Sequence, residues 1–180
     1  SGAQLALVAA ALEAECAKYS TLASDGRAGF GDMGVFWDWA SLDQPNGRTG
    51  KRTSKEQARF EAALLNMDLW FGHQGAVTFL LTSLPDSTPP ARKKRPYDAS
   101  GWTTYERSAA DLKRFARQRR QLQCATWELV VEVGPAASSP RWPLVGPDQF
   151  DGEIAHKSFA RKSDAKLVAA LYRKQGESQM

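Results

Sequence analysis

Two polar segments carry the side chains best suited to chemistry. Residues 38–44 follow the apolar run 35–37, and residues 97–106 follow a second apolar run around Phe79. In an open α/β sheet, ligands bind at the carboxyl ends of the strands, so both segments are predicted to lie at the binding edge. Asp38 would there either contact hydroxyl groups, such as those of a ribose, or be a buried acid at the strand end that accepts N–H bonds from its own loop, and both interpretations stay open.

The second acid, Glu106, also has two interpretations. Thr103-Thr-Tyr-Glu106 has the spacing of a capping box, in which the glutamate accepts a backbone N–H at the start of a helix. The capping box is the simpler of the two. In a chemical role, the Glu106 carboxylate would instead stay free. Glu106 lies four residues after Trp102.

Other nucleophile and metal chemistry has little support. No base lies near Ser41 in the sequence, and with His73 and His156 as the only histidines a Ser-His-acid triad is not indicated. Ser41 is instead predicted to shape its turn, and His73 to be a turn residue. Cys16 and Cys124 lie far apart without a Cys-x-x-Cys partner, which argues against zinc. The sequence therefore predicts no metal and no resident cofactor.

The elements that must position these residues alternate between helix and strand. Apolar spacing predicts helices over about 3–20 and 54–68, from the 97–106 segment to about Arg120, and from Ser163-Asp164 onward. Thr53-Ser-Lys-Glu56 is a predicted capping box for the second helix, and Ser163-Asp164 a predicted cap for the last. Strands are predicted at 34–39, 76–82 and 126–133, and proline-rich loops at 83–96 and 134–152. This order predicts one α/β domain over residues 1–180, with an open, mostly parallel sheet and helices on both faces.

The predicted order begins on a helix, so the first strand of such a sheet is expected to be missing from the printed chain. Ser1-Gly2 resembles the remnant of an expression tag. The missing strand would come from residues upstream or from another chain.

At the two polar segments the sequence resembles the TIR-domain superfamily, and more closely a group of TIR-like proteins of algae, oomycetes and other microbial eukaryotes. Where that group has Val-Phe-Trp-Asp-Phe-x-Ser-Leu-Pro-Gln, this chain has Val35-Phe-Trp-Asp-Trp-Ala-Ser-Leu-Asp-Gln44. The other matching residues are Arg52-Thr53, Glu56, Phe60, Leu80-Leu81-Thr82, Leu84-Pro85, Tyr97-Asp98, Ser100-Gly101-Trp102, Glu106, Ser163-Asp164, Val168 and Leu171-Tyr172-Arg173. The resemblance covers about residues 34–175.

The resemblance implies a flavodoxin-like fold and cleavage of NAD at the nicotinamide glycosidic bond. Glu106 takes the place of the catalytic glutamate of NAD-cleaving TIR domains, which lies four residues after a tryptophan. A positioned carboxylate suits this reaction because bond cleavage develops oxocarbenium charge on the ribose. The predicted substrate-binding residues are Asp38, Trp39, Ser41, Tyr97 and Trp102.

Two non-enzymatic interpretations remain beside this one. The first is a scaffold module that self-associates or binds another protein through loops at 43–52 and 83–98. The second is phosphate or nucleic-acid binding by two basic clusters, one at 92–95 and one formed by Lys113, Arg114, Arg117, Arg119 and Arg120. Nucleic acid is the weakest, because Phe115 is the only aromatic residue among these basic ones.

The composition and hydropathy of the chain predict where the protein is located in the cell. The net charge is +4 and 42% of the residues are hydrophobic, an ordinary balance for a folded domain. No stretch approaches about 18 continuous apolar residues, so we expect a cytoplasmic protein without a membrane partner.

Overall fold

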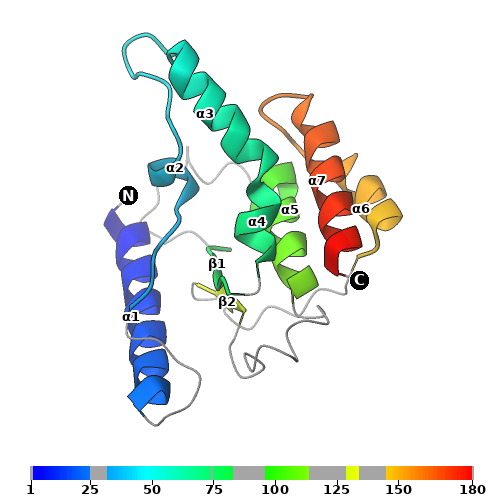
Figure 1. Cartoon of the computed structure of the whole chain (residues 1–180). Helices are drawn as coiled ribbons and strands as arrows, with labels where there is room; N and C mark the ends of the chain where they lie inside the picture. Colours follow the sequence, from blue (N-terminus) through cyan, green and yellow to red (C-terminus); the bar gives the residue numbers. More distant parts are fainter. Residues whose placement is uncertain are drawn as a thin grey trace.

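The structure, a computed structural model, describes residues 2–24, 32–73, 75–82, 96–113, 129–133 and 145–179. In this part of the chain, helices surround a small sheet (Figure 1). Helix α1 (Gly2–Ser24) is drawn on one side of the sheet, and the helices of the second half of the chain on the other. No helix among these residues combines the length and hydrophobicity that crossing a bilayer requires.

The sheet consists of two parallel strands, β1 (Thr78–Leu80) and β2 (Val130–Glu132). The Thr78 N–H donates to the Leu129 carbonyl, and the Val133 N–H to the Leu80 carbonyl, both at 2.9 Å. The predicted strand at 76–82 and the parallel pairing are confirmed. The predicted strand at 126–133 is confirmed for its last part, since residues 126–128 lie outside the described residues. The chain is therefore a mixed α/β structure.

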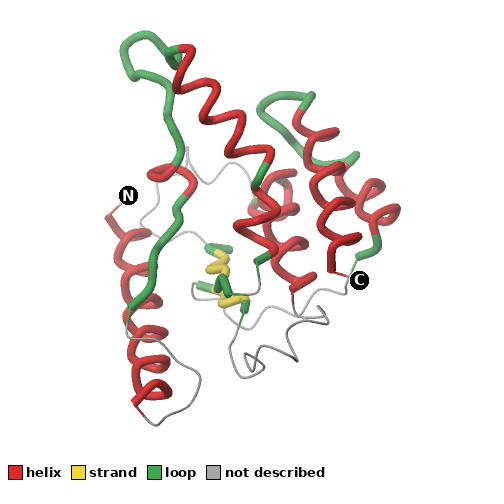
Figure 2. Tube along the Cα trace, viewed as in Figure 1, coloured by secondary structure: helices red, strands yellow, loops and turns green. Residues whose placement is uncertain are grey.

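The predicted strand at 34–39 is wrong. Residues 32–37 form a loop, and Asp38–Ser41 form the short helix α2 (Figure 2). Val35 is 54% exposed, so this apolar run is not buried. A strand needs a neighbour for its backbone groups. Instead, the Trp37 carbonyl accepts the Ser41 N–H at 2.7 Å and so starts a helical turn.

The predicted helix at 54–68 is two helices, α3 (Ser54–Leu65) and α4 (Met67–Gly72). Its predicted capping box is confirmed. The Thr53 hydroxyl accepts the Glu56 N–H at 3.3 Å, and the Glu56 carboxylate accepts the Thr53 N–H at 2.7 Å. Asn66 separates the two helices, and its side-chain amide donates to the Ala62 carbonyl at 2.8 Å.

The main core lies between α4, α5 (Gly101–Leu112), α6 (Pro147–Ile154) and α7 (Asp164–Gln179). Phe150 stacks on Tyr172 with ring centroids 4.0 Å apart, and both side chains are buried. The Tyr172 hydroxyl donates to the Val145 carbonyl at 2.6 Å. The final helix was predicted to start at Ser163-Asp164, and its start at Asp164 confirms this.

Helix α6 contradicts the loop predicted over 134–152. Prolines suggested a loop, but Pro147 occupies the first turn of the helix, where a missing N–H breaks no helical hydrogen bond. Phe150 and Ile154 then bury one face of α6 in the core. Residues 134–144 lie outside the described residues, as do 83–95 of the other predicted loop.

We predict that Thr53→Ala lowers the free energy of unfolding by about 1 kcal/mol, because it removes the acceptor that caps α3. Thr53→Ser keeps the acceptor and should retain most of this stability. Urea denaturation followed by circular dichroism measures both variants. Lys55→Ala, an exposed change in the same helix turn, is the control. An equal loss in Thr53→Ala and Lys55→Ala would show that the cap contributes nothing specific.

Candidate functional site

Glu106 lies in the second turn of α5, and the capping box predicted for it is wrong. The helix begins at Gly101 with Ser100 as its N-cap, which places Glu106 at the sixth helical residue. The hydroxyls of Thr103 and Thr104 donate back to the Ser100 carbonyl, at 3.1 and 2.8 Å. Glu106 is therefore too far into the helix to bond the backbone N–H groups at its start.

Backbone pairing explains this early helix start. Ser100 forms an isolated parallel bridge with Ser158. The Gly101 N–H donates to the Ser158 carbonyl, and the Ser158 N–H donates to the Ala99 carbonyl, both at 2.9 Å. Glycine is required at 101, because a Cβ there would lie 1.9 Å from the Phe159 ring. The 158–159 segment thus sets where α5 begins.

The Glu106 carboxylate lacks a hydrogen-bond partner within the described part of the chain, and its side chain is partly buried. Burial and, second, the negative charge of Asp38 together raise the pKa of Glu106 to about 8. Glu106 is therefore mostly protonated at pH 7 in the free protein. A carboxyl group that is part-buried, unbonded and shifted in this way is available for chemistry rather than committed to structure.

Asp38 supplies that second negative charge from a distant part of the chain. It is the first residue of α2 and is exposed. The interpretation of Asp38 as a buried acid at a strand end is wrong, since residues 32–37 form no strand. The expectation that segments 38–44 and 97–106 meet holds for these two acids, which are near enough for their charges to interact.

Tyr97 lies near Glu106. It begins the short 3-10 helix η2 (Tyr97–Ala99) and packs against the buried cluster formed by Leu80, Ala110, Leu129 and Val130. Burial is the main reason that its pKa rises above the usual range, and the charge of Glu106 is the next. The Thr103 hydroxyl donates to the Tyr97 carbonyl. Tyr97 thus offers a neutral phenol close to Glu106.

Trp102 is held by the last helix. Its indole N–H donates to the Asp164 carboxylate at 3.1 Å, and its ring meets Tyr105 edge to face at a centroid distance of 6.2 Å. Sequence reasoning treated Asp164 only as a helix cap and missed this contact. A polar residue at the start of a helix gives no signal for a partner 62 positions away.

The remaining residues considered in the sequence analysis contribute less to the candidate site. The Ser41 hydroxyl accepts the Trp37 N–H at 3.0 Å, which agrees with a role in shaping the turn. The side chain of Trp39 lies outside what the structure describes. His73 ends α4, and its Nδ1 accepts the Gly75 N–H at 3.0 Å, as expected for a turn residue.

The predicted second basic cluster loses one member. Lys113 is buried, and its ammonium group donates to the Ala76 carbonyl at 2.9 Å and to the Thr78 hydroxyl at 2.8 Å. It therefore joins α5 to β1 instead of facing a phosphate. Residues 92–95 and 114–120 lie outside the described residues.

No group of acids, histidines and cysteines that could hold a metal occurs within the described ranges. A cavity of about 710 Å³ is present, but none of the predicted site residues lines it. The candidate site is thus a partly buried acid, a second acid and a phenol on the surface beside α5. No family model matches this chain, and neither does any curated protein or solved structure.

We predict that the Glu106 carboxyl titrates with a midpoint of about 8. Asp38→Asn should lower this midpoint, because it removes a like charge. Carbon-13 NMR of the glutamate carboxyl carbons measures the Glu106 midpoint in wild type and in Asp38→Asn. Glu56 is an internal control, because hydrogen bonds from Thr53 lower its pKa. A midpoint near 4.5 for Glu106 would contradict the burial described above.

The raised pKa of Glu106 also makes the stability of the folded state depend on pH. The folded state holds the Glu106 proton more tightly than the unfolded state does, so stability should fall as pH rises from about 4.5 to about 8. Glu106→Gln removes this contribution. The variant should therefore gain more thermal stability over wild type at pH 8 than at pH 5.

Proposed function

We propose that this chain is a TIR-like domain of flavodoxin-like fold that cleaves NAD at the nicotinamide glycosidic bond, with Glu106 as the catalytic residue. The observation that carries the proposal is the Glu106 carboxyl: partly buried, without a hydrogen-bond partner in the described structure, and beside Asp38. A helix-capping role was the main alternative for Glu106, and its position in α5 removes that alternative.

The chemistry that this site supports can be written step by step. The C–N bond to nicotinamide breaks, and its electron pair neutralises the ring nitrogen. Ionised Glu106 stabilises the oxocarbenium charge that develops on the ribose. Water then attacks C1′ and gives its proton to a carboxylate, either Glu106 or Asp38.

The raised pKa of Glu106 fits a cationic substrate. The nicotinamide ring of NAD is positively charged, and a positive charge near a carboxyl group favours its ionised form. Substrate binding would therefore ionise Glu106 where the charge is needed. For the free enzyme, activity should increase with pH up to about 8, because ionised Glu106 is the active form.

We predict that the protein releases nicotinamide from NAD and that Glu106→Gln reduces the rate at least about 100-fold. Liquid chromatography of nicotinamide measures the rate over a range of protein concentrations that permits self-association. Glu61→Gln is the matched control, since Glu61 is an exposed glutamate on α3. Equal rates in wild type and Glu106→Gln, whether high or absent, would remove Glu106 from the catalytic role.

A second candidate function is a non-catalytic interaction module, and the loop before α3 favours it. Figure 1 shows this loop at the end of α3, away from the sheet. The Asp43 carboxylate accepts two hydrogen bonds from Arg59, both at 2.8 Å, and these hold the pKa of Asp43 below its usual range. Arg52 donates to the Asp43 carbonyl and lies 3.6 Å from the centre of the Phe60 ring.

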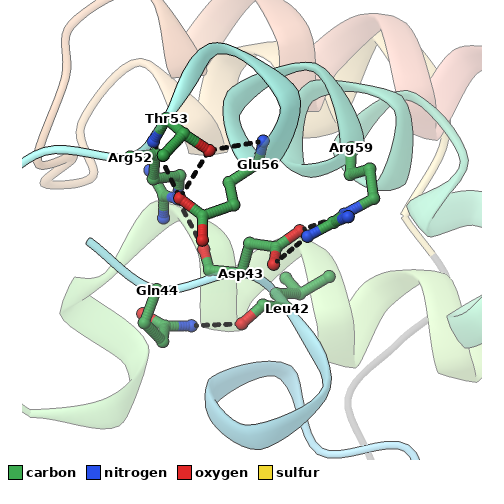
Figure 3. Close-up of polar contacts among 7 residues, drawn as sticks. All are labelled: Leu42, Asp43, Gln44, Arg52, Thr53, Glu56 and Arg59. Atoms are coloured by element: carbon green, nitrogen blue, oxygen red, sulfur yellow. Dashed lines mark hydrogen bonds and ion pairs between the residues drawn. The ribbon is translucent and has the colours of Figure 1, made fainter. Parts of the chain in front are cut away.

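These contacts fasten both ends of the loop to the start of α3. Figure 3 shows the network, whose members are Leu42, Asp43, Gln44, Arg52, Thr53, Glu56 and Arg59. Within the loop, the Asn46 carboxamide oxygen accepts the Arg48 N–H at 2.9 Å, and Gly50 adopts a positive φ of 63°. A projecting loop with fixed ends binds a partner at a lower entropic cost than a loose one does.

We predict that the protein self-associates and that Asp43→Ala weakens the association about tenfold, which corresponds to about 1.4 kcal/mol. Asp43→Ala removes the contact with Arg59 and so releases the loop. Sedimentation velocity over a concentration series measures the dissociation constant. Glu177→Ala, an exposed change on α7, is the control. A wild-type protein that stays monomeric at high concentration would exclude self-association through this loop.

A further inference from the structure

Strand β1 has one paired edge and one open edge. In a parallel pair, successive residues direct their backbone groups to opposite edges. Thr78 and Leu80 bond to the β2 strand and its flanking residues, so the N–H and C=O of Phe79 point the other way. Within the described chain, the backbone groups of Val77 and Phe79 have no hydrogen-bond partner.

A cavity of about 710 Å³ adjoins this part of the chain. The described residues that line it are Leu12 of α1, residues 32–36, Trp70 and Phe71 of α4, and residues 75–79. Apart from Asp32 and Thr78, the side chains of the described lining residues are apolar or absent. Both α1 and α4 contribute apolar groups, so an occupant would meet hydrophobic surface from two helices.

A second segment with backbone groups that no described residue bonds lines the same cavity. Residues 32–37 run as an extended segment toward α2 (Figure 2). Neither the N–H nor the C=O groups of Gly34, Val35 and Phe36 bond to any other described residue. Phe36 stacks on Trp70 with ring centroids 4.5 Å apart, so this segment is anchored to α4 by its side chain.

We propose that this cavity is an acceptor site for one extended polypeptide strand of a partner protein, apolar on both faces. N–H and C=O groups that no described residue pairs lie along the open edge of β1 and along residues 34–36. A peptide backbone presents complementary groups on both of its edges. The apolar lining from α1 and α4 selects apolar side chains. Each lining stretch spans five residues, 32–36 and 75–79. A strand of that length covers about 17 Å.

The strand proposal can be tested separately from the proposed catalytic function. Neither Glu106 nor Asp38 lines the cavity, so a failed NAD cleavage assay would leave the strand proposal untouched. The converse also holds, because a protein that binds no strand could still cleave NAD.

The test uses a fluorescein-labelled peptide, Lys-Val-Val-Ile-Val-Thr-Lys, and fluorescence anisotropy on the full chain. Wild type should bind this peptide at a dissociation constant below about 1 mM. The same peptide N-methylated at its two central residues loses a donor on each edge and should bind at least about tenfold more weakly. Equal binding of both peptides would overturn the proposal, as would no binding of the first.

Two protein variants locate the site. Phe79→Pro removes the open-edge N–H without breaking a bond to β2, which makes proline acceptable at this edge position. Phe79→Ala removes the same side chain but keeps the N–H. We expect peptide binding to weaken at least about fivefold more in Phe79→Pro than in Phe79→Ala. Equal affinities would overturn the assignment, and circular dichroism checks that both variants are folded.

The comparison of the two peptides on wild type still decides the matter if Phe79→Pro does not fold. A second copy of this chain is the other occupant to exclude. If wild type dimerises, and the unmethylated peptide dissociates the dimer while the methylated peptide does not, the occupant is a second copy and the partner-strand proposal is wrong.

Discussion

The position at which α5 begins determines the candidate site. The backbone pairing of residues 99–101 with Ser158 fixes the helix start at Gly101, and the close approach of Phe159 leaves no room for a side chain there. From that start, Trp102 falls in the first turn, where it reaches Asp164, and Glu106 falls in the second. A start three residues later would make Glu106 a helix cap. Backbone hydrogen bonds between segments far apart in sequence thus decide which role this glutamate has.

Glu56 and Glu106 show how the same local pattern leads to opposite electrostatics. Both follow a threonine by three residues. At Thr53 the capping box forms, and hydrogen bonds to the Glu56 carboxylate lower its pKa. At Thr103 the helix has already begun, no described residue bonds to the Glu106 carboxylate, and burial together with the Asp38 charge raises its pKa to about 8. The difference lies in tertiary context, because residue types and spacing are alike.

Local patterns predicted the parts of the fold that local physics controls. The α3 cap, the β1 strand and the start of α7 depend on side chains within a few positions of one another, and all three are confirmed. The 34–37 run and helix α6 depend on what lies beside them. The first has a strand-like composition but no strand partner among the described residues, whereas the second has proline at a position that tolerates it. The approach of Asp38 to Glu106 followed from the rule for strand ends, although the first of those strands does not form.

The open edge of β1 and the acid pair are connected through one segment. Residues 32–36 line the cavity, and the chain passes from there through Trp37 directly into Asp38. A strand bound against Gly34–Phe36 would restrain the backbone two residues before Asp38. Asp38 is the charge that acts on Glu106, so restraint of this segment would alter the interaction between the two acids. The cavity and the acids are coupled only if Asp38 can take two positions relative to Glu106 and the occupant binds the protein with different affinity in each.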